Sequence, residues 1–389
     1  DSNDITLTST GGGIEAQSVV AGSNNDVTLD AQGGSITENS DAASDVTADV
    51  LTADAAGGVD LDTTVASTDI STSAAGDVNI DETDAIVLTD VDTNDGAITI
   101  DAGGQITATD VDSSNTDDDS NDITLTSTGA GIEATSVVAG SVNDATLDAQ
   151  GGSIDSTTDD GTADVTGDVV DLVADSGGIG TTSPVDVTAA SQLNADSTAD
   201  NGDIFIDGIG DTPVGVITAG AAGGDIELDS TGAISDTNNG VASVIGTDAI
   251  LRSSGGMGSG IAGSATDLET SVSNLDVSNL VGGAIVIVND VGGLLTVTDL
   301  DADSFAVDGV GGNGEIRNQS PLTINSDAIT SGGMTYTAAD SALENVDNLT
   351  VTNGATVQDT TASLVLNAGD DLNLDPGTTI QSSTLLTLK

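Results

Sequence analysis

The chain has 389 residues and a formal net charge of −62, from 65 acidic and three basic residues. Proteins that bind nucleic acids or anionic membranes contact phosphates through Lys and Arg, so this charge argues against both functions. His and Cys are absent and aromatic residues make up 1% of the chain, which excludes imidazole and thiol catalysis and an aromatic core.

A long internal repeat organises the first part of the chain. The sequence from Ser2 to Ile36 returns from Ser120 to Ile154 at a constant offset of 118 residues, and 31 of the 35 positions are identical. Such self-similarity is typical of proteins in which one structural unit stacks on the next. We predict that residues 1–389 form a single continuous β-solenoid. Residues 2–119 and 120–154 onward would belong to a duplicated block of five coils, and 155–389 would be diverged coils.

Short stretches that alternate apolar and polar residues recur along the chain and predict β-strands. In chain order they read DITLTST, DVTLDAQ, DVNIDET, AITIDAG, DIFIDGI, DIELDST, AIVIVND, NLTVTNG and SLVLNAG. Most are bounded by Gly, Asn, Asp or Ser, which favour turns. The predicted coil starts lie near Asn3, Asn25, Val50, Gly76, Gly96, Asn121, Asn143, Val170, Gly202, Gly224 and Gly283. Their spacing matches one turn of a repeat solenoid.

We therefore predict an all-β fold, a right-handed parallel β-helix of roughly 14 coils with about three short strands per coil. Alternation would direct Ile5 and Leu7 inward and Thr6 and Thr8 outward. Phe205 and Phe305 are expected to fill the core, and Tyr336 could lie inside or outside. A β-sandwich array is one alternative, but it would need hairpin turns and aromatic fillers. Disorder is another, because high charge with few aromatic residues is typical of disordered chains.

Three segments carry a resemblance to a known family. They read DVVDLVADSGGIGTTSPVDVTAASQLNADSTADNGDIFIDGIGD, GGDIELDSTGAISD and SLVLNAGDDLNLDPG. The sequence pattern of these segments resembles that of the repeat regions of very large bacterial surface adhesins of the filamentous-haemagglutinin-like type. The resemblance implies a secreted β-helical shaft, displayed as a fibre or stalk for attachment. It carries over no catalytic residues, and the secretion domain of that family is not found in this sequence.

Carboxylates are the main chemical groups that this composition leaves. Acidic runs such as Asp117–Asp119 and Asp159–Asp160 could in principle serve a β-helical polysaccharide lyase or hydrolase, or a phage-type spike. Such enzymes tend to use aromatic and basic residues to hold their substrates, and this chain has few of either. We predict no catalytic residues and no enzyme activity.

Calcium is the one cofactor that the sequence suggests, although none is required. Ca²⁺ prefers oxygen ligands in turns, and two segments are similar in sequence to the first residues of an acidic calcium-binding loop. They are DVDTNDG, from Asp90 to Gly96, and DLDADS, from Asp299 to Ser304. The candidate ligands are Asp90, Asp92, Asn94, Asp95, Asp299, Asp301 and Asp303. Neither loop has the Glu expected at the twelfth position, and the alternative is that these residues form turns and solvated surface.

These observations predict a secreted structural protein on a bacterial surface, such as a fibre or an adhesin shaft. The expected partners are further copies joined end to end or the continuation of a longer chain, and a host or matrix glycan or protein. No apolar run reaches the roughly 18 residues that span a membrane. A calcium- or glycan-binding β-helical module is the alternative. The sequons at Asn318 and Asn348 are expected to be chance matches.

Overall fold

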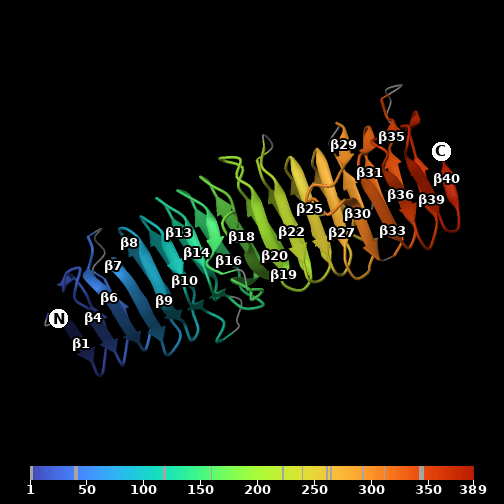
Figure 1. The fold of residues 1–389 in the computed structure, drawn as a ribbon. Helices are drawn as coiled ribbons and strands as arrows, with labels where there is room; N and C mark the ends of the chain where they lie inside the picture. Colours follow the sequence, from blue (N-terminus) through green and yellow to red (C-terminus); the bar gives the residue numbers. More distant parts are fainter. Residues whose placement is uncertain are drawn as a thin grey trace. The chain divides into compact units, whose positions relative to one another are not determined.

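The computed structural model describes residues 3–38, 43–116, 120–158, 160–220, 223–238, 240–259, 262, 265–290, 293–310, 312–340 and 346–389. Within these ranges every regular element is a β-strand, and neighbouring strands pair in parallel (Figure 1). The predicted parallel β-solenoid is therefore confirmed. The chain forms two compact units, Asp1–Ser191 (unit 1) and Gln192–Lys389 (unit 2).

The strands of unit 1 are short, with three long exceptions. They are β1 (Ile5–Ser9), β2 (Ile14–Glu15), β3 (Val19–Val20), β4 (Val27–Ala31), β5 (Ile36–Thr37), β6 (Val46–Ala55), β7 (Val59–Thr72), β8 (Val78–Glu82), β9 (Ile86–Asp92), β10 (Ile98–Ala102), β11 (Ile106–Ala108), β12 (Val111–Asp112), β13 (Ile123–Ser127), β14 (Ile132–Ala134), β15 (Val137–Val138), β16 (Ala145–Ala149), β17 (Ile154–Ser156) and β18 (Val165–Ala174). The next strand, β19 (Val185–Asp196), includes the boundary between the units.

The strands of unit 2 have two to seven residues. They are β20 (Ile204–Gly208), β21 (Thr212–Thr218), β22 (Ile226–Ser230), β23 (Ile234–Asp236), β24 (Val244–Ile245), β25 (Asp248–Ser253), β26 (Leu268–Ser271), β27 (Asn274–Asn279), β28 (Val286–Asn289), β29 (Leu295–Val297), β30 (Phe305–Val310), β31 (Gly314–Asn318), β32 (Leu322–Ile324), β33 (Asp327–Ser331), β34 (Met334–Ala338), β35 (Leu349–Val351), β36 (Thr356–Asp359), β37 (Leu364–Asn367), β38 (Leu372–Leu374), β39 (Thr379–Ser382) and β40 (Leu386–Leu388).

Unit 1 contains two ladders in which an apolar side chain lies on its counterpart one turn later. Ladder A runs through Leu7, Leu29, Ala53, Ile70, Val91, Val111, Val137 and Val165. Ladder B runs through Ile14, Ile36, Val59, Val78, Ile98, Ile123, Ala145 and Val170. From the second turn onward all these residues are buried. Each buried Val, Leu or Ile stabilises the fold by about 1.5–3 kcal/mol relative to exposure.

The two copies of the repeated nonapeptide lie in different ladders. Ile5 pairs with Val27 next to ladder A, whereas its counterpart Ile123 belongs to ladder B. Ladder B takes five turns and 109 residues from Ile14 to Ile123, so the offset of 118 is five turns plus nine residues. The prediction that the block covers a whole number of coils is wrong. The second copy presents its sequence on another side of the coil.

Unequal turn lengths cause this shift. From Val27 to Leu51 the turn takes 24 residues, but from Leu51 to Thr68 it takes only 17. The sequence placed successive coil starts at Val50 and Gly76, and so missed the short turn between them. The structure contains about 16 turns, slightly more than the roughly 14 coils predicted, because short turns of this kind were missed.

Unit 2 confirms the prediction of three strands per coil from β28 onward. One ladder joins β28, β31, β34, β37 and β40. A second joins β29, β32, β35 and β38, and a third joins β30, β33, β36 and β39. Each of these turns is therefore a three-sided coil held by continuous parallel hydrogen bonding.

The core of both units is a narrow stack of Val, Ile, Leu and Ala side chains. Tyr336 is fully buried in this stack, which settles its position inside the coil. The prediction for Phe205 is wrong, because Ile204 and Ile206 occupy the inward positions and alternation directs Phe205 outward, where it is half-buried. Phe305 is also only half-buried.

Glycines at the corners allow successive turns to approach at the spacing of paired strands. A Cβ atom on Gly34 would lie 2.6 Å from the backbone nitrogen of Gly13, and one on Gly76 would lie 2.2 Å from that of Gly58. No Cβ atom tolerates such contacts with backbone. Corner glycines are therefore a steric requirement of the stacking.

Replacement of Gly76 by Ala should lower the free energy of unfolding by about 1–3 kcal/mol, because the added methyl group forces two turns apart. Gly11→Ala is the matched control, since a Cβ atom there would have no heavy atom within 4 Å. Urea unfolding followed by circular dichroism would measure both variants. Equal effects of the two substitutions would contradict the steric argument.

Candidate functional site

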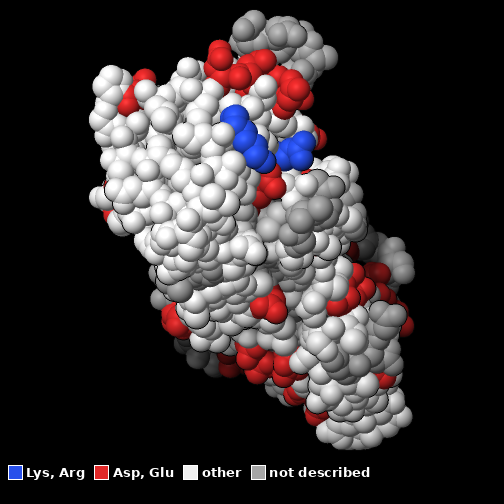
Figure 2. Space-filling model, turned by 90° about the vertical axis from the view of Figure 1, so that its right-hand side faces the viewer, with Lys and Arg blue, Asp and Glu red and all other residues white. Residues whose placement is uncertain are grey.

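Outward-facing carboxylates stack in register in the same way as the core residues. Asp62, Asp81 and Asp101 follow one another on successive turns, and Asp92 pairs with Asp112. Paired strands are about 4.8 Å apart, so these like charges repel each other across the ladder. On the face shown in Figure 2, acidic side chains recur along the surface, and the few basic ones lie beside acidic ones.

The first predicted calcium loop lies where β9 ends. Asp90 pairs with Asp69 and Asp92 with Asp112, and Asp95 makes a backbone bridge with Ala75. In the described ranges, the predicted acids of this loop do not belong to a group of three converging carboxylates. The structure therefore does not bring the acids of this loop together as one set of metal ligands.

A recess of about 350 Å³ nevertheless borders this loop. Its lining consists only of polar residues: Ser71, Thr72, Asp92, Thr93, Asn94, Asp112 and Asn115. The Asn115 amide nitrogen donates to Asn94 Oδ1 at 2.7 Å, and the Thr93 hydroxyl donates to the Gly96 carbonyl at 2.6 Å. Much of this polar lining is thus engaged in holding the corner itself.

The second predicted loop, Asp299–Ser304, joins β29 to β30 and is held by its own carboxylates. Asp299 accepts hydrogen bonds from the backbone nitrogens of Ala302 at 2.7 Å and Ser304 at 3.1 Å. Ala302 and Ser304 have backbone φ angles of 67° and 86°, which residues other than Gly seldom adopt. Asp303 accepts from the Phe305 nitrogen and so serves the turn.

This loop folds over an outward residue of β27. Asp276 is only 2% exposed, and its Oδ2 atom accepts hydrogen bonds from Leu300 N at 2.7 Å and Asp301 N at 3.4 Å. Carboxylate oxygens of Asp276, Asp299 and Asp301 all lie within 4.8 Å of one another. Two of the seven predicted ligands therefore converge with a third residue that the sequence did not suggest.

Arg252 of β25 supplies the positive charge next to this group. Its guanidinium forms ion pairs with Glu227, with Asp229 at 2.8 Å and with Asp301 at 3.0 Å. Burial lowers the pKa of Arg252, but hydrogen bonds to Glu227 and Asp229 outweigh burial and raise it overall. The guanidinium remains charged and joins β22, β25 and the Asp299–Ser304 loop.

Asp276 could not have been found from local spacing. It lies 23 residues before Asp299, about one turn earlier, and it reaches the loop only because successive turns stack. Carboxylate oxygens are the ligands that Ca²⁺ prefers, and three of them converge here. The group made of Asp276, Asp299 and Asp301, here called the loop carboxylates, is the candidate metal site of unit 2.

Unit 1 contains a second converging group, made of Glu38, Asp45 and Asp62, whose carboxylate oxygens also lie within 4.8 Å of one another. Sequence reasoning missed it, because Asp62 lies one turn after the connection between β5 and β6 that contains Glu38 and Asp45. Asp45 is 1% exposed, and its backbone nitrogen donates to the carbonyl of Asp62 at 2.7 Å.

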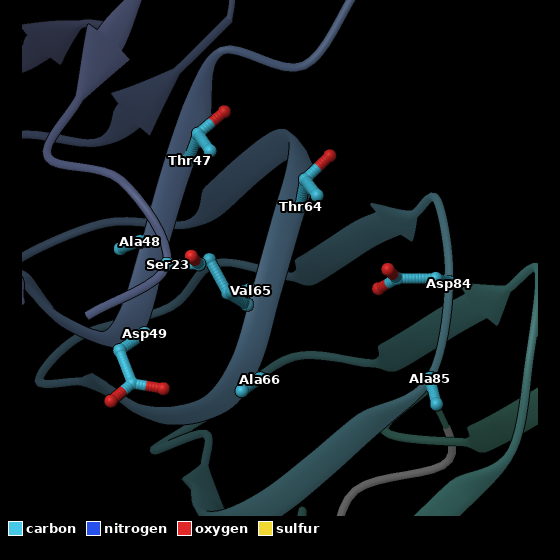
Figure 3. Close-up of a pocket in the computed structure, with 9 residues that line it drawn as sticks. All are labelled: Ser23, Thr47, Ala48, Asp49, Thr64, Val65, Ala66, Asp84 and Ala85. Atoms are coloured by element: carbon cyan, nitrogen blue, oxygen red, sulfur yellow. The ribbon is translucent and has the colours of Figure 1, made fainter. Parts of the chain in front are cut away.

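A recess of about 320 Å³ lies next to this group (Figure 3). Its lining includes Thr47 and Thr64, which are two residues after Asp45 and Asp62. It is lined by Ser23, Thr47, Ala48, Asp49, Thr64, Val65, Ala66, Asp84 and Ala85. Figure 3 shows Thr47 and Thr64 on neighbouring strands with their hydroxyls pointing the same way. The recess thus crosses successive corners of unit 1, with alanine and valine next to hydroxyls and carboxylates.

The predicted sequon at Asn318 has a definite position. Asn318 is fully buried, and its amide donates to the carbonyls of Gly293 and Pro321, so the folded chain has no room for a glycan there. The acidic runs Asp117–Asp119 and Asp159 lie outside the described residues.

Comparisons with protein families, with curated proteins and with solved structures found no match. Among the described residues there is no helix long and apolar enough to cross a membrane.

Several carboxyl groups have raised pKa values, with burial as the main cause. The pKa is about 6 for Asp92, Asp164 and Asp276 and about 7 for Glu269. Neighbouring carboxylates raise them further, such as Asp90 beside Asp92. In each case the charged form is disfavoured in the folded chain.

These shifts predict that the protein is more stable in mild acid than above neutrality. Between the unfolded pKa near 4 and the folded values of 6–7, the folded state binds more protons, so the free energy of unfolding falls as pH rises. Urea midpoints measured between about pH 5 and pH 8 at constant ionic strength should therefore decrease with pH. A midpoint that rises over this range would contradict the prediction.

Proposed function

We propose that this chain is a non-catalytic structural element, the shaft of a secreted bacterial surface fibre or adhesin. The observation that supports this most is the uninterrupted succession of paired turns within each unit. Nearly every apolar side chain in these ladders is used to hold one turn on the next. The chain is thus organised as a scaffold around its own axis.

The character of the recesses supports the same function. The two recesses described above have about 320 and 350 Å³, near the lower limit for small-molecule sites. Their linings combine carboxylates with Ser, Thr, Asn and Ala, and the chain has no His or Cys to act as a base or nucleophile. This composition favours a surface that is solvated over one that performs catalysis.

The charge favours an extracellular location. Stacked carboxylates that repel one another need counterions, and a saline or calcium-containing exterior supplies them. The resemblance to filamentous-haemagglutinin-like repeat regions agrees with such a location. Partners in this function would be further copies or a longer chain of which these turns are part, and a host or matrix surface.

Immunogold labelling of intact cells of the source organism would test this function. Antibodies raised against the chain should label the outside of unpermeabilised cells, along fibres or stalks. A permeabilised sample serves as the control for total antigen. Label confined to the cell interior would contradict the proposal.

A second candidate function is calcium binding by the loop carboxylates. The convergence of Asp276, Asp299 and Asp301 within 4.8 Å favours it over the first predicted loop. The bound ion would relieve the repulsion among three carboxylates, of which Arg252 pairs only with Asp301. It would also tie the Asp299–Ser304 loop to β27.

Calcium should raise the unfolding temperature of the wild-type chain at constant ionic strength, by an amount that grows with its concentration. Asp299→Asn should abolish most of this increase, because it removes one of the three carboxylates. Asp375→Asn, at an exposed residue outside the group, is the control with the same change of charge. The same calcium response in both variants would exclude the loop carboxylates as the site.

A further inference from the structure

Unit 2 contains a column of polar side chains where one of its ladders approaches a corner. Positions near the ends of β22, β25, β27, β30, β33, β36 and β39 lie over one another on successive turns. The residues there, here called the corner column, are Ser230, Ser253, Asn279, Gly309, Thr330, Asp359 and Ser382. Most of the polar members are buried, and buried polar groups in folded proteins are hydrogen-bonded. These side chains therefore need partners within the corner.

The polar members find these partners in the backbone of the corners. The hydroxyl of Ser253 accepts a hydrogen bond from the backbone nitrogen of Gly256 at 3.1 Å. The carboxylate of Asp359 accepts one from the backbone nitrogen of Gly333 at 2.9 Å. Corner backbone leaves the strand ladders, so its polar groups require other partners. A side chain of the corner column supplies such a partner on these turns.

Gly309 interrupts the column, because it has no side chain to contribute. A Cβ atom at this position would lie 2.9 Å from the backbone oxygen of Asn279, and the φ angle of Gly309 is 153°. Residues other than Gly rarely adopt this conformation. The backbone geometry thus excludes a polar side chain from this one position of the column.

Asn279, one turn earlier, presents an unused acceptor next to the interruption. Its side chain is buried, with 1% exposed, and its Nδ2 atom donates to the carbonyl of Gly283 at 3.0 Å. This bond fixes the orientation of the amide, because the reversed amide would place two oxygens against each other. Among the described residues, no donor reaches the buried Oδ1 atom of Asn279. A buried acceptor of this kind indicates that a further donor binds there.

A small cavity beside Gly309 has the size and the lining for one water molecule. Its volume is about 10 Å³, close to the roughly 10–15 Å³ that a single water requires. Asn279, Thr330 and Ser331 line it with polar side chains. The Thr330 hydroxyl donates to Asp359 at 3.2 Å, so its oxygen can still accept. The Ser331 hydroxyl makes only a long contact of 3.5 Å with the carbonyl of Gly309 and can donate elsewhere.

The charges around the cavity favour a neutral ligand. Its three polar side chains, an amide and two hydroxyls, are uncharged. The nearby carboxylate of Asp359 already accepts hydrogen bonds from Thr330, Gly333, Thr361 and Ala362. A metal ion would compete with these four donors, whereas a water molecule needs only the two to four partners that the cavity offers.

We propose that one water molecule binds in this cavity and takes the place of the side chain that Gly309 lacks in the corner column. The water donates to Asn279 Oδ1 and Thr330 Oγ1 and accepts from the Ser331 hydroxyl. It connects the turn of β27 to the turn of β33 across β30. The site is separate from the loop carboxylates, and water binding there does not depend on the proposed function.

A crystal structure of the whole chain at about 1.5 Å would test the site directly. We expect one isolated density peak about 2.7–3.2 Å from both Asn279 Oδ1 and Thr330 Oγ1, the distances of hydrogen bonds. A cavity without density would overturn the inference. Contacts of about 2.3–2.6 Å to several oxygens would also overturn it, because they identify a bound cation.

Two substitutions at Thr330 test the same site in solution. Thr330→Val removes one partner of the water with little change of shape, and Thr330→Ser keeps the hydroxyl as the matched control. Relaxation dispersion of water ¹⁷O counts the long-lived waters of a protein. We expect Thr330→Val to hold one fewer than the wild type, and Thr330→Ser to hold the same number.

Equal counts in the two folded variants would overturn the inference, and circular dichroism would establish that both fold. If Thr330→Val does not fold, the density in the wild-type crystal decides the question without it. Loss of the long-lived water in Thr330→Val alone supports the site.

Discussion

The parallel pairing of each turn with the next is the constraint on which the rest of this structure depends. A strand that lies in register on its neighbour places every side chain directly over its counterpart, apolar on apolar in the core. The backbones must then approach at the spacing of paired strands at the corners as well. Glycines such as Gly34 and Gly76 are the residues that allow this, because a Cβ atom there would overlap the neighbouring turn.

The same register that stabilises the core also stacks negative charges on the outside. Asp92 lies opposite Asp112, and Asp62 lies opposite Asp81. The free energy of this repulsion is reflected in the raised pKa of Asp92, where Asp90 and Asp112 add to the effect of burial. A scaffold with this surface depends on protons or cations from its surroundings, which connects its stability to its environment.

Arg252 shows how one cation can serve several turns. Its three carboxylate partners come from β22 and from a loop that follows β29, and the loop in turn covers Asp276 of β27. None of these residues needs to be close in sequence, because stacking brings successive turns together. The loop carboxylates are therefore a product of the coil and not of a local motif.

By itself the sequence determined the fold class, because alternating β-branched residues, turn-forming Gly and Asp, and a long internal repeat all indicate a parallel solenoid. It also indicated Asp299 and Asp301, whose spacing in one loop is visible locally. Only the tertiary structure decided the length of each turn, and the short turn after Leu51 moves the second copy of the repeat into the other ladder. It alone placed Asp276 under the loop, because contacts between turns depend on the length of each turn, which local patterns do not encode. The outward position of Phe205, by contrast, follows from its alternation with Ile204 and Ile206.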